Sequence, residues 1–377
     1  MHVKRTIATL GTAAGCALAL ATAPAATAHP APAQLVVTKT LSTGTYIGPL
    51  QFAVKGHKVL VADSFTATLN LLGRTAPLAT FAGEGSDIAG VAWGEHHTYA
   101  YTESNATHTD TFLVIVGEHG TRKVNLAAFE KKYNPDKINH YGTTSNDPCV
   151  IQALTPPPGP PGPEGPQPPA KYKGLVDSHP YSVVAAKHGS WIVADAGGND
   201  ILKVDKWGNI HVVAVLPPQP QVITAELASQ FGGPNAPACL IGTTYNFEPV
   251  PTDVEFTRWG QLYATTLGSV VPGNSSVYKI DWGHVHKIVG GLTTATNLAI
   301  DGHGNIFAAQ LFPGLVSEIP SGSHTASVVA ALPGVVAVEW ANGKLYASTA
   351  PAAAAEGAPS SGPPPFGTIV VLGPAHA

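Results

Sequence analysis

Short apolar stretches alternate with polar turns along most of the chain, and the alternation recurs with the same internal pattern. In each recurrence an apolar segment is followed by a polar turn and then by alternating residues that end in a small or acidic one. Turns such as residues 55–57 and 341–343 contain Gly or Asn, which tolerate the positive φ of tight two-strand connections. The pattern predicts antiparallel hairpins, whose second strands are residues 59–63, 98–102, 191–195, 261–265, 305–309 and 344–348.

A third and a fourth strand follow several of these hairpins, as in residues 201–205 and 211–215. Units of four strands that recur about every 40 residues are typical of propeller blades. The second strands begin 39, 93, 70, 44 and 39 residues apart, so six blades fit and two intervals carry insertions. We therefore predict an all-β fold, a six-bladed β-propeller of four-stranded blades. Residues 35–37 are expected to pair with the last blade and close the ring, which removes free sheet edges.

The two long intervals hold insertions at about residues 103–176 and 217–248. Within them, residues 125–133 and 224–231 predict short helices, because each has a capping Asn or Thr and apolar side chains on one face. Residues 155–170 are rich in Pro and Gly, which predicts an extended, mobile loop. We expect the insertions to form a partial lid over one face of the propeller.

The first 28 residues have the features of a secretory signal peptide. Lys4 and Arg5 precede an apolar stretch at residues 7–20, and the small residues 26–28 predict cleavage before His29. An alternative reading, a lipid-anchored Cys16, lacks the Leu expected three residues earlier. We therefore expect a secreted chain with one propeller domain at residues 29–377.

Composition and charge exclude several classes of protein. Gly and Pro contribute 40 and 34 of 377 residues without a triplet period, so the chain is not collagen and is not typical of a helix bundle. The net charge of −4 leaves no basic face for nucleic acid. After residue 40 no apolar run approaches the ~18 residues that span a bilayer. The expected molecule is a monomer without a transmembrane segment.

Two cysteines remain after the predicted cleavage, Cys149 and Cys239, each in a loop-like setting. An even pair in an oxidising compartment favours a disulfide over two separate thiols. Such a bond would close a loop of about 90 residues and tie the two insertions together.

Polar residues recur where the first strands of the blades converge on the propeller axis. They are His179, Asp253, Glu255, Asn297 and Glu339. Clustered carboxylates with an amide or a histidine can hold Ca²⁺ or another divalent cation, which could activate water for hydrolysis of a lactone or an ester. In the structural alternative they cap strand ends or accept backbone hydrogen bonds between blades. Asp253, Glu255, Asn297 and Glu339 are the candidate metal ligands.

A second group of candidates lies in the third repeat. Asp195, Asn199 and Asp200 surround two glycines, and with His179 they are candidate ligand-binding residues. An oxygen-rich loop of this kind suits a cation or a sugar, whereas the structural alternative has the side chains bonding nearby backbone N–H groups to fix the turn. Asp63 and Asp195 occupy equal positions in their repeats, which favours a structural role for that position.

The third repeat reads VDSHPY at residues 176–181 and VADAGGND at residues 193–200, and EPVPTDVE follows at residues 248–255. These runs resemble the ScyD/ScyE family of secreted proteins, and the resemblance extends over roughly residues 48–346. It implies an exported six-bladed propeller related to NHL-repeat and gluconolactonase-like propellers. It implies no particular activity. The chain departs from the family pattern in the first and second blades, where residues 65–67 read Phe-Thr-Ala in place of Gly-Gly-Asn.

The chain lacks a G-x-S-x-G elbow, a Walker loop, a dinucleotide fingerprint and an H-E-x-x-H motif. The sequence therefore favours a secreted ligand-binding or scaffold propeller of the ScyD/ScyE type, whose partner is an unidentified small molecule or extracellular protein. The alternative is a metal-dependent lactonase or ester hydrolase with an axial carboxylate site and a divalent cation such as Ca²⁺. A quinone-dependent sugar dehydrogenase and an accessory role in exported secondary metabolism rest on analogy alone. Whether the protein catalyses a reaction is left open.

Overall fold

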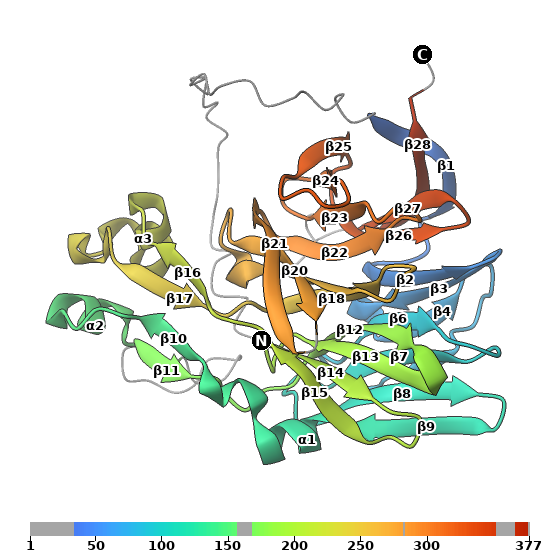
Figure 1. Ribbon diagram of the computed structural model, residues 1–377, viewed down its shortest axis with the longest axis horizontal. Helices are drawn as coiled ribbons and strands as arrows, with labels where there is room; N and C mark the ends of the chain where they lie inside the picture. The colour runs from blue at the N-terminus through green and yellow to red at the C-terminus, as the bar shows by residue number, and fades with distance from the viewer. Residues whose placement is uncertain (1–33, 157–167, 282, 352–365, 376–377) are drawn as a thin grey trace.

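The computed structural model describes residues 34–156, 168–281, 283–351 and 366–375. Its described strands form seven four-stranded antiparallel sheets, of which six are the blades of a propeller (Figure 1). The predicted signal peptide and most of the Pro-rich loop at residues 155–170 lie outside the described residues. The prediction of an all-β, six-bladed propeller is confirmed.

Each blade is a meander whose first strand lies nearest the axis. Blade 1 holds β2 (Pro49–Lys55), β3 (Lys58–Asp63), β4 (Thr68–Leu71) and β5 (Ala79–Thr80). Blade 2 holds β6 (Asp87–Trp93), β7 (Tyr99–Ser104), β8 (Thr111–Gly117) and β9 (Gly120–Asn125). Blade 3 holds β12 (Pro180–Ala186), β13 (Ser190–Asp195), β14 (Asp200–Val204) and β15 (Ile210–Val215).

The second half of the ring repeats this arrangement. Blade 4 holds β18 (Pro251–Phe256), β19 (Leu262–Thr266), β20 (Ser275–Asp281) and β21 (His284–Leu292). Blade 5 holds β22 (Ala295–Ile300), β23 (Ile306–Gln310), β24 (Leu315–Ile319) and β25 (Ser327–Ala331). Blade 6 holds β26 (Val335–Ala341), β27 (Lys344–Thr349), β28 (Thr368–Pro374) and β1 (Leu35–Thr43).

The ring is closed by the two ends of the described chain. The first strands β2, β6, β12, β18, β22 and β26 contact one another in this order, and β26 returns to β2. Blade 6 takes its outer strand from the N-terminal side, since β1 pairs antiparallel with β28 from Leu35 opposite Pro374 to Thr43 opposite Thr368. The predicted closure by residues 35–37 is therefore confirmed. It leaves the outer edge of β28 covered.

Apolar side chains fill the spaces between neighbouring blades. Ile192 and Ile201 of blade 3, for example, pack with Val254 and Leu262 of blade 4 in one cluster. Each second strand also contributes an alanine of 0% exposure, because only a small side chain fits where two blades approach closely. These residues are Ala62, Ala100, Ala194, Ala264, Ala308 and Ala347.

The insertions form the seventh sheet, which the sequence did not predict. Its strand order is β11 (Lys171–Lys173), β10 (His140–Thr143), β17 (Thr244–Phe247) and β16 (Gln219–Val222). The first insertion begins later than the expected residue 103, because residues 111–125 form β8 and β9 of blade 2. The first insertion leads directly into β12 and the second into β18, and both are first strands of blades. The seventh sheet therefore stands at the end of the ring where the first strands begin (Figure 1).

The described parts of the two insertions contain three short α-helices. They are α1 (Leu126–Tyr133), α2 (Pro148–Leu154) and α3 (Ala225–Gly232). Asn125 caps α1 by accepting from the backbone N–H of Ala128, and Thr224 caps α3 by accepting from that of Leu227, which confirms the two predicted helices. The 3₁₀ turns among the described residues are η2 (Ser64–Thr66), η3 (Pro135–Ile138), η4 (Lys187–Gly189), η5 (Gly233–Asn235), η6 (Ala238–Leu240) and η7 (Gly268–Val270).

Candidate functional site

Two of the predicted metal ligands lie in a hydrogen-bonded network across the propeller axis. The carboxylate of Asp253 accepts from the hydroxyl of Ser182 and, at 2.9 Å, from the backbone N–H of Leu298. Asn297 accepts from the backbone N–H of Val338 at 2.7 Å and donates to the side-chain oxygen of Gln51 at 3.2 Å. Gln51, Ser182, Asp253 and Asn297, the axial network, are each at most 4% exposed.

The members of the axial network occupy one structural position. Each follows a β-bulge in its first strand, where the register shifts by one residue against the second strand. The bulge turns the next side chain toward the axis. Sequence reasoning found Asp253 and Asn297 but missed Gln51 and Ser182, although an alignment of the repeats places all four in one column.

Glu255 and Glu339 lie two residues further along their first strands. Burial, and after it the charges of Glu339 and Asp253, raise the pKa of Glu255 well above its ordinary value. Burial and the charge of Asp253 likewise raise the pKa of Glu339 to about 8. Burial and mutual repulsion therefore favour the protonated forms of both glutamates.

The axial residues have the oxygen donors of a cation site but not its arrangement. In the part of the chain that the structure describes, no three His, Cys, Asp or Glu side chains are grouped as ligands of one metal ion. Both oxygens of Asp253 already accept hydrogen bonds from the protein, so a metal ion would have to displace them. The geometry suits the structural reading of Asp253 and Asn297, namely acceptance of backbone hydrogen bonds between blades. The metal-site prediction stays a prediction.

His179 lies at the end of the ring where the first strands begin, in a group that we call the mouth site: Asp87, His108, Asp177 and His179. Asp87 begins β6, His108 lies in the turn between β7 and β8, and Asp177 and His179 come just before β12. The Nε2 atom of His179 lies 2.6 Å from Asp87 Oδ2, and the Nδ1 atom of His108 lies 2.8 Å from Asp177 Oδ1. The two imidazole rings stack with centroids 4.5 Å apart and planes 6° from parallel.

The carboxylates set the charge state of the mouth site. Burial disfavours a charged His179, but the charge of Asp87 and its hydrogen bond outweigh burial and raise the pKa of His179. Burial alone would raise the pKa of Asp177, whereas the hydrogen bond and charge of His108 hold that pKa at about 2. The mouth site is thus two imidazole–carboxylate pairs, a combination that can bind polar groups and transfer protons.

The mouth site retains both access and unused hydrogen-bonding capacity. The side chains of Asp87, His108 and Asp177 are 22%, 12% and 23% exposed, whereas that of His179 is 8% exposed. Asp87 Oδ1 and Ser104 Oγ are buried atoms without a hydrogen-bond partner among the described residues, and the two residues face each other across β6 and β7. A buried acceptor is costly to leave unpaired, so this spot suits a group that donates.

The other candidates in the third repeat have different environments. Asp195 accepts from the backbone N–H groups of His179 at 2.6 Å, Gly197 at 3.2 Å and Gly198 at 3.1 Å, as the turn-fixing alternative predicts. Asn199 instead joins two segments, since it donates to Asp136 at 3.0 Å and accepts from the backbone N–H of Val250 at 3.0 Å. Asp200 is 1% exposed, and neither of its carboxylate oxygens has a partner among the described residues.

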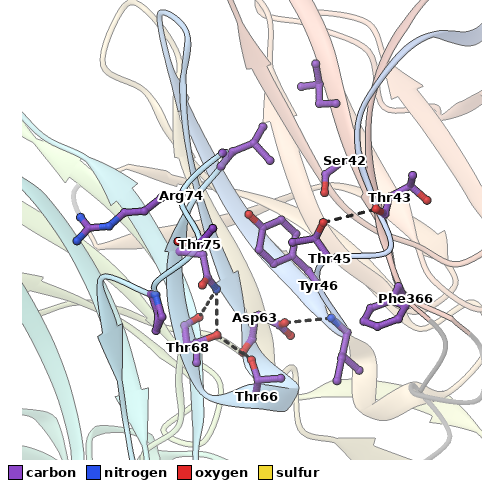
Figure 2. A pocket seen from close by; sticks show the side chains of 16 residues that line it. Ser42, Thr43, Thr45, Tyr46, Asp63, Thr66, Thr68, Arg74, Thr75 and Phe366 are labelled. Atoms are coloured by element: carbon purple, nitrogen blue, oxygen red, sulfur yellow. Dashed lines mark hydrogen bonds between the residues drawn. The ribbon is translucent and has the colours of Figure 1, made fainter. Parts of the chain in front are cut away.

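A wider groove of about 770 Å³ lies between blades 6 and 1, bordered by residues 41–47, β3 and β4 (Figure 2). Hydroxyl groups predominate on its walls, as at Thr43 and Thr68, and Tyr46 and Phe366 add aromatic rings. Its carboxylate, Asp63, accepts from the backbone N–H groups of Ile47 at 3.0 Å and Gly48 at 2.7 Å. This acid therefore anchors the chain, which makes the groove a weaker candidate than the mouth site.

The predicted disulfide between Cys149 and Cys239 is present and joins α2 to η6. Apolar side chains of both insertions surround it, including Val150, Leu227 and Leu240. A disulfide indicates an oxidising compartment. None of the helices in the described part of the chain is both long and apolar enough to span a membrane.

The propeller is similar to the PQQ-bound aldose sugar dehydrogenase from Streptomyces coelicolor, with a TM-score of 0.53, 15% identity, and coverage of 92% of this chain and 99% of that chain. It also matches a streptogramin B lyase (TM-score 0.48, 10% identity, 91% and 98% coverage) and a gluconolactonase from Xanthomonas campestris (0.41, 13%, 85% and 82%). No protein-family model and no curated protein matches the chain. At these identities the likeness establishes the propeller fold and neither a cofactor nor a reaction.

Proposed function

We propose that the protein is an exported propeller that binds a small polar ligand at the mouth site. The observation that carries the proposal is the pairing of two stacked histidines with separate carboxylates, beside an oxygen of Asp87 that has no hydrogen-bond partner among the described residues. Structural histidines need one partner each and no spare acceptor. Here the acceptor is buried, while its neighbours stay partly open to solvent.

The chemistry of the mouth site defines the class of ligand. Asp87 Oδ1 accepts a hydrogen bond, and the hydroxyl of Ser104 both donates and accepts. A ligand with hydroxyl or ammonium groups matches this set, whereas an apolar ligand leaves both atoms unpaired. We therefore infer a small hydroxylated or amine-bearing compound.

Export and family membership are part of the same proposal. The disulfide is compatible with export, and the predicted signal peptide at residues 1–28 would direct it. The ScyD/ScyE assignment rests on the motif runs in the third and fourth repeats, and Asp177 and His179 of the mouth site lie in the first of those runs.

The proposal is tested by thermal-shift screening of the mature protein, followed by calorimetry. The panel consists of aldoses, sugar lactones, amino acids and polyamines. We expect Asp87→Asn to weaken binding of a stabilising compound at least tenfold, or by about 1.4 kcal/mol. His286→Gln, a change at an exposed histidine on β21, is the matched control. No stabilising compound at millimolar concentration, or equal affinity in Asp87→Asn, would contradict the proposal.

Metal-dependent lactone or ester hydrolysis is the second candidate, and the three carboxylates that β18 and β26 contribute near the axis, those of Asp253, Glu255 and Glu339, favour it. Its test is hydrolysis of a lactone and ester panel before and after chelation. Activity that is lost with a chelator and in Glu339→Gln would support this candidate. Activity that persists with the chelator and depends on His179 would place the reaction at the mouth site instead.

A further inference from the structure

Asp200 is a buried carboxylate without a described partner, at a place that neither the axial network nor the mouth site uses. It begins β14, is 1% exposed, and neither of its oxygens accepts a hydrogen bond from the described residues. Asp195, five residues earlier, shows the contrast, since the hydroxyl of Ser178 and three backbone N–H groups satisfy it. Leaving an ionised carboxylate buried without a partner is costly, so an isolated Asp200 requires a counter-charge or a proton.

The first insertion places two further buried carboxylates near Asp200. Glu130 of α1 and Asp136 of η3 are 3% and 0% exposed, and one oxygen of each lacks a hydrogen-bond partner among the described residues. We call Glu130, Asp136 and Asp200 the acidic cluster.

Two contacts show that these residues share one space. Asp200 Oδ1 and Glu130 Oε2 lie 3.4 and 3.5 Å from the position that a Cβ atom on Gly198 would occupy, so both oxygens border the gap left by that glycine. Asn199, the neighbour of Asp200, donates to Asp136 Oδ2 at 3.0 Å. The charges of Glu130 and Asp136 also act on Asp200, since burial first, then the charge of Asp195 and then these two charges raise its pKa well above the ordinary value.

We propose that the acidic cluster binds one Ca²⁺ ion and thereby fastens the first insertion to blade 3. Carboxylate oxygens are hard donors that Ca²⁺ prefers, and the three side chains of the cluster offer no nitrogen or sulfur for a softer metal. Ca²⁺ also tolerates irregular geometry, which suits donors from a helix, a 3₁₀ turn and a strand. This inference does not depend on the ligand proposed for the mouth site.

Binding requires a local rearrangement. The described His, Cys, Asp and Glu side chains contain no group of three that converges on one metal position. The side chains of Glu130 and Asp136 must therefore turn toward Asp200 when the ion binds. An ion held this way replaces mutual repulsion among three carboxylates by attraction to a shared cation, so it stabilises the contact of α1 and η3 with β14.

The test is calcium binding to the mature protein after dialysis against EGTA, measured by calorimetry and by tyrosine-sensitised terbium luminescence. The hydroxyl of Tyr141 donates to Asp136 at 3.2 Å, so a terbium ion in the cluster lies close to an excitable ring. We expect one ion per chain, a rise in melting temperature with CaCl₂, and at least 100-fold weaker binding in Asp200→Asn and Glu130→Gln. Asp205→Asn removes a carboxylate from a turn of the same blade, where it accepts from the backbone N–H of Trp207, and should bind like the wild type.

Gly198→Ala keeps the test decisive if the isosteric variants do not fold. The added methyl group makes ordinary contacts of 3.4 and 3.5 Å with the two carboxylate oxygens, so the fold tolerates it, but it occupies the gap between them. We expect at least tenfold weaker calcium binding. If the folded wild-type protein binds no calcium at millimolar concentration, the proposal is overturned, and the carboxylates of the cluster are neutral because they are protonated. Equal affinity in wild type, Asp200→Asn and Gly198→Ala would overturn the position of the site.

Discussion

The carboxylate of Asp195 accepts a hydrogen bond from the backbone N–H of His179 at 2.6 Å, and this bond fixes the start of β12 at the mouth site. The same bond occurs in blade 1, where Asp63 accepts from the backbone N–H of Gly48 at 2.7 Å. In both blades the acid ends the second strand and pairs in register with the proline that begins the first strand. A repeated structural anchor thus positions a residue of the mouth site in blade 3 only.

Because the two anchors are equivalent, Asp63→Asn and Asp195→Asn should destabilise the protein to a similar extent. An amide offers one acceptor oxygen where the carboxylate offers two, so each variant leaves buried donors unpaired, and we expect a loss of about 1–3 kcal/mol. Urea unfolding measures this loss. Only Asp195→Asn should also weaken a ligand of the mouth site. Equal ligand affinity in both variants would show that the hydrogen bond of Asp195 does not position His179 for ligand binding.

The histidine pair makes a prediction for titration. In the wild type the charge of Asp87 raises the pKa of His179, while burial acts in the opposite direction. Asp87→Asn removes the charge and keeps the burial, so the pKa of His179 should fall below that of an exposed histidine. Histidine-resolved NMR titration measures both values. An unchanged pKa in Asp87→Asn would show that another group sets the charge of His179.

The same pair gives stability a pH dependence of known sign. A histidine whose pKa is raised by folding contributes stability that is fully present below its unfolded pKa and is lost as pH rises through the folded pKa. His179→Gln should therefore cost more stability at pH 5 than at pH 8, as measured by urea unfolding at the two pH values. A larger cost at pH 8 would contradict the pairing of His179 with Asp87.

Much of the fold follows from local pattern. The alternation in residues 59–63 or 191–195 indicates a strand with one buried face, and a Gly or Asn turn indicates a hairpin. Each blade can therefore be predicted from a continuous stretch of sequence. The equal positions of Asp63 and Asp195 in their repeats likewise predicted a structural role for both acids, because the repeat pattern is local. The disulfide could be predicted as well, because two cysteines after the predicted cleavage site can form one intramolecular pair.

The parts that sequence reasoning missed depend on contacts between distant segments. Thr143 of β10 meets Thr244 of β17 across 101 residues, and neither short strand has a pattern of its own. Gln51 and Ser182 join the axial network because bulges turn them inward, which a list of acidic residues does not reveal. His108 reaches the mouth site from a turn that carries no recognisable motif.

The disulfide predicts a regional effect. Replacing Cys149 and Cys239 by Ser removes a crosslink that closes a loop with a sequence separation of 90 residues. The chain-entropy model gives a loss of about 4 kcal/mol for a loop of this size. Since the bond joins α2 to η6, hydrogen exchange should accelerate most in β10, β16 and β17. The wild-type protein under reducing conditions is the matched comparison. Equal acceleration in β22 and β23 would show that the bond supports the whole ring.

Glu339 provides a test that separates a protonated axis from a metal site. Its pKa is raised to about 8 by burial and by the charge of Asp253, whereas the unfolded chain releases this proton near the ordinary value of 4.5. Between these values the unfolded state binds fewer protons, so the contribution to stability is full below pH 4.5 and is lost as pH rises through 8.

Glu339→Gln should therefore show a flatter decline of unfolding free energy between pH 5 and pH 8 than the wild type. One retained proton accounts for at most about 1.4 kcal/mol per pH unit. Glu84→Gln, at an exposed position, should keep the wild-type slope. If Asp253, Glu255 and Glu339 held a divalent cation instead, they would bind it as ionised carboxylates, and stability would rise with pH until a chelator abolished the rise. The sign of the slope, measured with and without EDTA, decides between the two states of the axis.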